Sequence, residues 1–154
     1  MVLSKPLPRV LCVEDDEDSR AMLITPLRHA LIEAQAVGTA VQAISSIQTE
    51  HFDLYLLDSR LPDIDGSDLC RQMRAFDPDT PILFFSGAAY EADKKRGIEA
   101  GANAYVIKPD FDGLLGTVNQ FVSRAESAAV RTSADRKMNN TRPLTYEIAR
   151  ASYM

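Results

Sequence analysis

Polar side chains of chemically useful types follow four short apolar runs in this 154-residue chain. They comprise an acid pair, a further acid, a hydroxyl and a lysine: Glu14 and Asp15, Asp58, Ser86, and Lys108. Mg²⁺ prefers oxygen ligands, and a carboxylate can act as a nucleophile that forms an acyl phosphate. A lysine and a hydroxyl can stabilise phosphoryl oxygens. These residue types together predict a site that handles a phosphoryl group beside a metal ion.

Each element taken alone has an ordinary structural interpretation. Adjacent acids after a strand commonly begin a helix, where carboxylates satisfy free N–H groups. Lys108 before Pro109 is typical of a loop, and Ser86-Gly87 is typical of a turn. The joint placement favours chemistry, because the carboxyl ends of parallel strands meet at the edge where open α/β sheets bind ligands.

The elements that must position these side chains alternate between strand and helix. We expect strands at residues 10–13, 36–37, 52–57, 81–85 and 104–107, and helices at 18–32, 39–50, 67–75, 90–100 and 111–128. Pro26 predicts a kink or a helix whose first turns are short. Thr39 and Gln42 form a candidate capping box, and Gly101 is a candidate helix stop. The alternation predicts an α/β fold, a doubly wound five-stranded parallel sheet with five flanking helices.

Length and composition favour one domain with short extensions. We expect an N-terminal extension at residues 1–7, the domain at 8–128, and a tail at 129–154 that is partly disordered or a short helix. Residues 1–123 hold 11 Lys and Arg against 19 Asp and Glu, whereas residues 124–154 hold 6 against 3. Because phosphate contacts need a basic surface, the acidic body argues against direct DNA binding.

Compartment and membrane association can also be estimated from the sequence. No stretch approaches the roughly 18 apolar residues of a membrane span, and the start lacks the apolar core of a secretory signal. Cys12 and Cys70 lie within apolar patterns, so we expect buried thiols in a reducing compartment. The expected location is therefore cytoplasmic.

The order and spacing of these motifs resemble the receiver domain of two-component response regulators, over about residues 8–125. The matching motifs are Glu14-Asp15 after a strand, Asp58-Ser59-Arg60-Leu61-Pro62-x-x-Asp65-Gly66, Ser86-Gly87, and Tyr105-x-x-Lys108-Pro109. The resemblance implies a flavodoxin-like fold and a phosphoprotein that takes its phosphoryl group from a histidine kinase or a histidine phosphotransfer protein. Such a protein catalyses only its own phosphorylation and dephosphorylation.

The resemblance also implies a role for each matched residue. Asp58 would be the phosphoacceptor, with Ser86 and Lys108 contacting the phosphoryl group. Mg²⁺ would be held directly by Asp15 and through water by Glu14, with Asp58 and the backbone carbonyl of Arg60 also at the metal site. Tyr105 would be an aromatic switch that turns inward as the Ser86 hydroxyl moves toward the phosphate.

The expected output is contact with an unidentified protein. In many regulators that dimerise through their last elements, two acids precede the aromatic switch, but here Asn103-Ala104 precede Tyr105. Residues 114–123 contain no charged side chain, so we expect a partner or a homodimer through the last helix instead.

Two other functions compete with that of a receiver. An aspartyl-phosphate hydrolase would use similar acid, serine and lysine chemistry, but it needs a general acid two residues after the nucleophile, where Arg60 stands. We also expect no cap domain within this length. A scaffold of the same fold that works without phosphorylation is disfavoured because every phosphorylation group is present.

Overall fold

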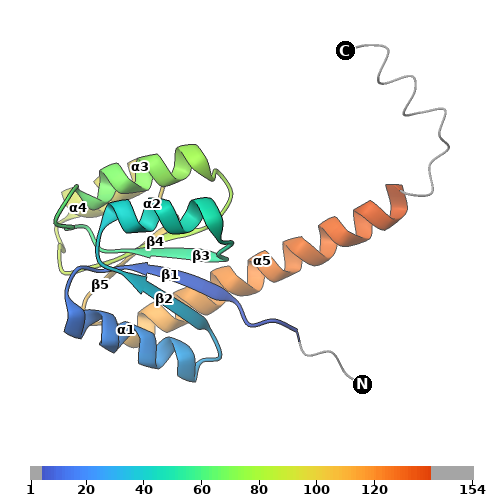
Figure 1. Ribbon diagram of the computed structural model, residues 1–154, viewed down its shortest axis with the longest axis horizontal. Helices are drawn as coiled ribbons and strands as arrows, with labels where there is room; N and C mark the ends of the chain where they lie inside the picture. Colours follow the sequence, from blue (N-terminus) through green and yellow to red (C-terminus); the bar gives the residue numbers. More distant parts are fainter. Residues whose placement is uncertain (1–4, 140–154) are drawn as a thin grey trace, which may run out of the picture. The chain divides into compact units, whose positions relative to one another are not determined.

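Strands and helices alternate along the chain from Arg9 onward (Figure 1). The computed structural model describes residues 5–139. The elements are β1 (Arg9–Val13), α1 (Glu17–His29), β2 (Glu33–Val37), α2 (Ala40–Thr49), β3 (Leu54–Leu57), α3 (Gly66–Phe76), β4 (Ile82–Ser86), α4 (Glu91–Glu99), β5 (Ala104–Ile107) and α5 (Phe111–Asn139). The chain divides into two compact units, Met1–Val122 and Ser123–Met154, and the sheet lies in the first.

All five strands are parallel, in the order β2-β1-β3-β4-β5. The register aligns their carboxyl ends, because Val13 pairs with Val37 and Leu57, and Leu57 pairs with Phe84. Strand order reverses between β1 and β3, and a crevice forms at such a switch point in doubly wound sheets. The predicted fold class is therefore confirmed.

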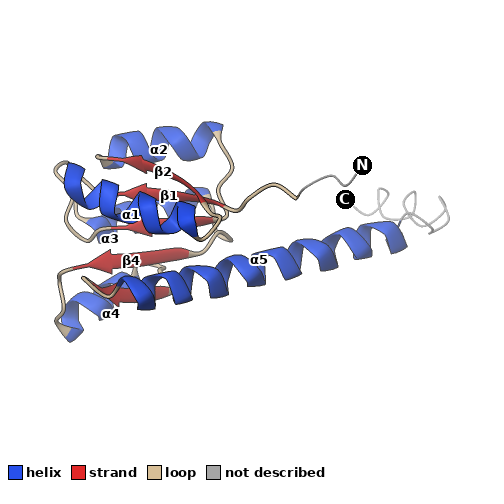
Figure 2. Ribbon diagram, turned by 90° about the horizontal axis from the view of Figure 1, so that it is seen from below, coloured by secondary structure: helices blue, strands red, loops and turns tan. Residues whose placement is uncertain are grey.

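Helices cover both faces of the sheet (Figure 2). Alternate strand residues supply the two cores, since successive side chains of a strand point to opposite faces. Leu11 and Phe84 belong to the core that packs with α2 and α3. Cys12 and Phe85 belong to the core that packs with α1 and the first part of α5. Both sheet faces are therefore buried at the centre of the sheet, which explains why the sequences of β3 and β4 and most of β1 are apolar.

Two helix ends follow the sequence expectations, the start of α2 only in part and the end of α4 in full. The Thr39 hydroxyl accepts the backbone N–H of Gln42 at 3.2 Å, but the Gln42 side chain accepts from Gly38 rather than closing the capping box. Gly101 ends α4 with φ of 116°, a left-handed conformation that suits glycine.

Several elements differ from the sequence expectations, most clearly α1, β2 and α5. α1 includes Pro26 without a break. Because proline has no N–H, the backbone carbonyl of Met22, four residues earlier, loses its helical hydrogen bond. Met22 lies on the exposed side of the helix, where water can replace the lost donor. β2 begins at Glu33 instead of residue 36, because it pairs with β1 along its whole length despite polar side chains. α5 continues to Asn139, beyond the expected end near residue 128, and residues 140–154 of the expected tail lie outside the described part.

Candidate functional site

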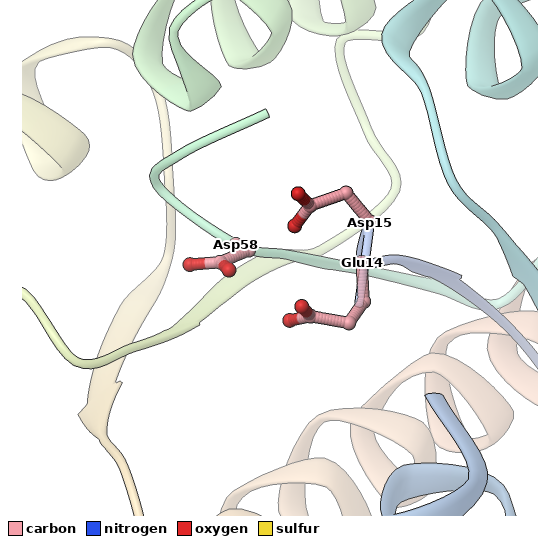
Figure 3. Close-up of side chains that lie close together, drawn as sticks. All are labelled: Glu14, Asp15 and Asp58. Carbon is pink, nitrogen blue, oxygen red and sulfur yellow. The ribbon is translucent and has the colours of Figure 1, made fainter. Parts of the chain in front are cut away.

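Three carboxylates meet where β1 and β3 end. The backbone N–H groups of Glu14 and Asp58 donate to Val37 and Val13, each at 3.0 Å, so the ladder fixes both residues one position past their strands. Ligand oxygens of Glu14, Asp15 and Asp58 all lie within 4.8 Å of one another (Figure 3). Glu14 is buried, whereas Asp15 is exposed. The sheet topology thus brings together acids that are more than forty residues apart.

Lys108 reaches this cluster from the end of β5. Its backbone N–H donates to the Ser86 carbonyl at 3.0 Å, which fixes the chain at the end of β4. The ammonium group lies 2.8 Å from Oε2 of Glu14 and 3.4 Å from Oδ2 of Asp58. Lys108 therefore bridges two of the three carboxylates.

The ionisation of this group reflects both burial and pairing. Burial raises the pKa of Glu14, and the Asp58 charge adds to this effect while the hydrogen bond from Lys108 opposes it. Burial alone would lower the pKa of Lys108, but its hydrogen bond to Glu14 and the neighbouring carboxylate charges outweigh burial and raise it. The lysine is therefore held in its charged form beside Asp58.

Ser86 lies at the end of β4 and is buried, with a side chain 1% exposed. Its hydroxyl contacts the Ser59 hydroxyl and accepts the backbone N–H of Ala88 at 3.1 Å. The Tyr105 ring stacks on Phe84 with centroids 5.5 Å apart, and its hydroxyl donates to the Ala88 carbonyl at 2.6 Å. The β4–α4 turn therefore links the predicted hydroxyl to the predicted aromatic switch through Ala88.

The loop that follows Asp58 is fixed by close backbone contacts. A Cβ at Gly66 would lie 2.3 Å from the Asp58 carbonyl oxygen, so this position requires a glycine. The Asp63 carboxylate accepts the N–H groups of Ala40 and Val41 at 3.0 and 3.1 Å, which attaches the loop to the start of α2. These contacts define the backbone around Arg60, whose side chain is exposed.

A cavity of about 90 Å³ lies behind this loop. Ser59, Tyr105, Ala88 and Arg96 are among the residues that line it. The cavity therefore lies between Ser59, the residue after Asp58, and the residues around Tyr105, the expected switch.

The sequence did not reveal two residues at the site. Ser59 contacts the Ser86 hydroxyl, and its position directly after Asp58 was the available signal. Arg20 donates to the backbone carbonyls of Glu14 and Asp15 at 3.1 and 3.3 Å, and it is the lone cation in the acid-rich stretch 14–20. The Ser59 contact depends on tertiary packing, whereas the Arg20 contacts lie within the turn between β1 and α1.

Comparison with known proteins decides the family. The model of the response regulator receiver domain matches residues 10–119. The chain belongs to this family. The receiver domain described here is accordingly a signalling module of two-component systems and not a metabolic enzyme.

The relatives of this receiver domain include larger regulators. The DNA-binding response regulator MtrA of Mycobacterium tuberculosis is 36% identical over 101 residues, which is 66% of this chain and 44% of MtrA. The transcriptional regulatory protein PrrA of the same species is 33% identical over 127 residues, covering 82% of this chain and 54% of PrrA. The chain thus spans about half the length of the curated relatives it matches.

Solved structures of receiver domains superpose on most of the chain. A putative response regulator from Chloroflexus aurantiacus is 31% identical with a TM-score of 0.72, covering 76% of this chain and 98% of that one. The non-phosphorylated HemR receiver domain of Leptospira biflexa is 32% identical with a TM-score of 0.69, covering 75% of this chain and 94% of that one.

None of the helices within residues 5–139 has the length and apolarity needed to cross a membrane.

The donor set at the site suits a hard divalent cation. Three carboxylates offer oxygen atoms within one small space, and Asp15 is open to solvent, so bound water can complete the coordination shell. Cys12 and Cys70 are buried, and burial raises their pKa values to about 12 and about 11, which keeps both thiols protonated. The oxygen donors therefore fit Mg²⁺ and offer no thiolate to a softer metal.

Proposed function

We propose that this receiver domain is a phosphoacceptor and that Asp58 takes the phosphoryl group. The main support is the position of the Asp58 carboxylate at the switch point of the sheet. It lies 3.4 Å from the Lys108 ammonium and in a cluster with the carboxylates of Glu14 and Asp15. A structural ion pair alone would not need Glu14 and Asp15 beside Asp58, since their mutual repulsion costs stability unless a cation is bound.

The proposed reaction is an in-line displacement at phosphorus. A carboxylate oxygen of Asp58 forms the new P–O bond while the P–N bond of a donor phosphohistidine breaks. The bond electrons go to the ring nitrogen, and because the other ring nitrogen of the donor already carries a proton, the ring leaves as neutral imidazole. The product is an acyl phosphate, which water later cleaves to carboxylate and inorganic phosphate. Lys108 holds a positive charge where the phosphoryl oxygens arrive, and the Ser86 hydroxyl supplies a hydrogen bond.

Mg²⁺ would be held by Asp15, Asp58, the Arg60 carbonyl and, through water, Glu14. When bound, the ion reduces the repulsion between the carboxylate and the incoming phosphoryl group. The residues' own part is to hold this arrangement: the strand ladder fixes Asp58, and the β4–β5 pairing fixes Lys108 opposite it.

Phosphorylation is proposed to act on the surface through Ser86 and Tyr105. The Ser86 hydroxyl would exchange its Ser59 partner for a phosphoryl oxygen, and the Tyr105 hydroxyl would leave the Ala88 carbonyl. Both changes alter the β4–α4 turn, which supports a switch in protein contacts there.

The partners follow from this role. The donor would be a histidine kinase or a histidine phosphotransfer protein, in keeping with the family, and a cytoplasmic location suits that exchange. The output would be an unidentified protein or a second copy through α5, without direct DNA binding by this chain. Leu114 and Val118 of α5 are buried in the domain's own core, so a homodimer would use other faces of that helix. Sedimentation showing a strict monomer with and without beryllofluoride would contradict the homodimer.

Labelling with acetyl phosphate and Mg²⁺ tests the function. We expect wild type to gain one acid-stable, base-labile phosphoryl group and Asp58→Asn to gain none. Asp53→Asn is a matched control, because Asp53 lies at the opposite end of β3 and should leave labelling unchanged. Equal labelling of wild type and Asp58→Asn would contradict the phosphoacceptor role, and no labelling of either would favour a scaffold.

A further inference from the structure

Arg20 holds the backbone that carries two of the three clustered acids. It lies in the first turns of α1, and one nitrogen of its guanidinium donates to the carbonyl oxygens of Glu14 and Asp15 at 3.1 and 3.3 Å. The turn between β1 and α1 is thereby closed by a side chain from within the helix it begins. The Asp16 side chain caps the same helix by accepting from Ser19 at 2.8 Å.

Gly38 faces the same guanidinium from the end of β2. A Cβ at Gly38 would lie 2.6 Å from the Arg20 nitrogen that makes both hydrogen bonds. The Arg20 guanidinium therefore lies between the Glu14–Asp15 turn and Gly38, in space that a larger side chain at position 38 would occupy. An open groove of about 620 Å³ lies beside them, lined by Arg20, Gly38 and Gln42 among others. A displaced guanidinium would have room to move into it.

The charge of Arg20 argues against a simple electrostatic role in binding a cation. A positive side chain near a dication lowers its affinity through Coulomb repulsion. Arg20 points its donors at backbone carbonyls and not at the carboxylates, which stay available to a metal. The geometry suits orientation of ligands, which is how residues behind metal ligands act in other proteins.

We propose that Arg20 is a positioning residue for the cation site, fixing the Glu14–Asp15 backbone so that both carboxylates face Asp58. This proposal rests on the function proposed above, because it assumes that the acid cluster binds Mg²⁺. Positioning and electrostatics predict opposite results when Arg20 is neutralised. Loss of positioning weakens Mg²⁺ binding, whereas loss of repulsion strengthens it.

Isothermal titration calorimetry of Mg²⁺ binding to the full, unphosphorylated chain tests the proposal. We expect Arg20→Gln to weaken binding about 10-fold, the lower end of the range for residues that orient metal ligands. Gly38→Ala, which keeps every charge and displaces the guanidinium, should weaken it in the same direction. Arg20→Lys should restore part of the loss because an ammonium group can still donate to one carbonyl. Arg28→Gln is the control, since it removes an equal charge from the last turn of α1.

The outcomes separate the possible failures. Binding by Arg20→Gln that equals or exceeds wild type overturns the positioning role. If Arg20→Gln does not fold, as judged by circular dichroism, Gly38→Ala carries the test alone, and unchanged affinity there overturns the role. Wild type that binds no Mg²⁺ contradicts the proposed function, whereas wild-type binding with unaffected variants contradicts Arg20 alone.

Discussion

Gly66 is expected to be irreplaceable, because its Cα lies against the backbone of Asp58, the proposed phosphoacceptor. In Gly66→Ala the new Cβ would lie 2.3 Å from the Asp58 carbonyl oxygen and 2.8 Å from the Ser59 Cα. Real Cβ contacts essentially never fall below 3.0 Å, so the start of α3 and the Asp58 backbone must separate by about 0.7 Å. Both groups are backbone, and neither can rotate away.

The magnitude follows from the cost of overpacking. Forcing extra volume into a packed site costs about 1–3 kcal/mol, and the rigid neighbours here place Gly66→Ala at about 2 kcal/mol or more. A shift of about 4 °C for each kcal/mol in a domain of this size gives a Tm lowered by roughly 8 °C. Phosphorylation by acetyl phosphate should also slow at a temperature where the variant is folded, because Asp58 moves away from Lys108.

Calorimetry of matched glycine variants checks this reasoning. Gly116 lies in an exposed part of α5 with no atom within 4 Å of a built Cβ, so Gly116→Ala should stabilise the domain by about 0.5–1 kcal/mol. The same substitution is thus expected to have opposite signs at the two positions. A Gly66→Ala domain as stable as wild type, with a normal labelling rate, would refute the close-contact argument.

Two further predictions concern stability away from the site. Leu31 has φ of 62° at the end of α1 and is 68% exposed. Leu31→Gly should therefore raise the free energy of unfolding by about 0.5–1 kcal/mol, whereas Leu31→Ala, which keeps the strained conformation, should not. Urea titration of both variants tests this difference. Burial alone would raise the pKa of Asp77, but hydrogen bonds from Thr80 and Tyr55 outweigh it and lower the pKa from 3.8 to about 2. Because the folded pKa is depressed, this stabilisation is present above pH 3.8 and lost as the pH falls toward 2, so the stability gap between wild type and Asp77→Asn should narrow over that window; a gap that stays constant would contradict it.

Much of the fold could be predicted because its determinants are local. Apolar runs of strand length, alternating with helical periodicity, predicted a parallel sheet, and Gly101 marked the end of α4 by its conformational freedom. β2 was harder because Glu33 and Gln35 are polar, and only pairing with β1 shows that they belong to a strand. The length of α5 could not be predicted once apolar periodicity faded near residue 128.

The residues of the candidate site also differ in how well the sequence alone predicts them. Asp58, Ser86 and Lys108 could be singled out because the end of a parallel strand is a position that the sequence itself defines. Asp63 and Arg20 could not, since Asp63 caps a helix that begins 23 residues earlier and Arg20 acts on carbonyl groups that any sequence possesses. Side chains whose partners are backbone atoms leave little trace in residue types.

The proposed function requires that the Asp58 carboxylate becomes the acyl phosphate. Borohydride reduces an acyl phosphate to an alcohol but leaves a free carboxylate intact, so phosphorylated protein can be reduced, digested and sequenced by mass spectrometry. We expect homoserine at position 58 only after treatment with acetyl phosphate and Mg²⁺. Reduction at Asp15 or Glu14 in place of Asp58, or no reduction in protein that carries phosphate, would contradict it.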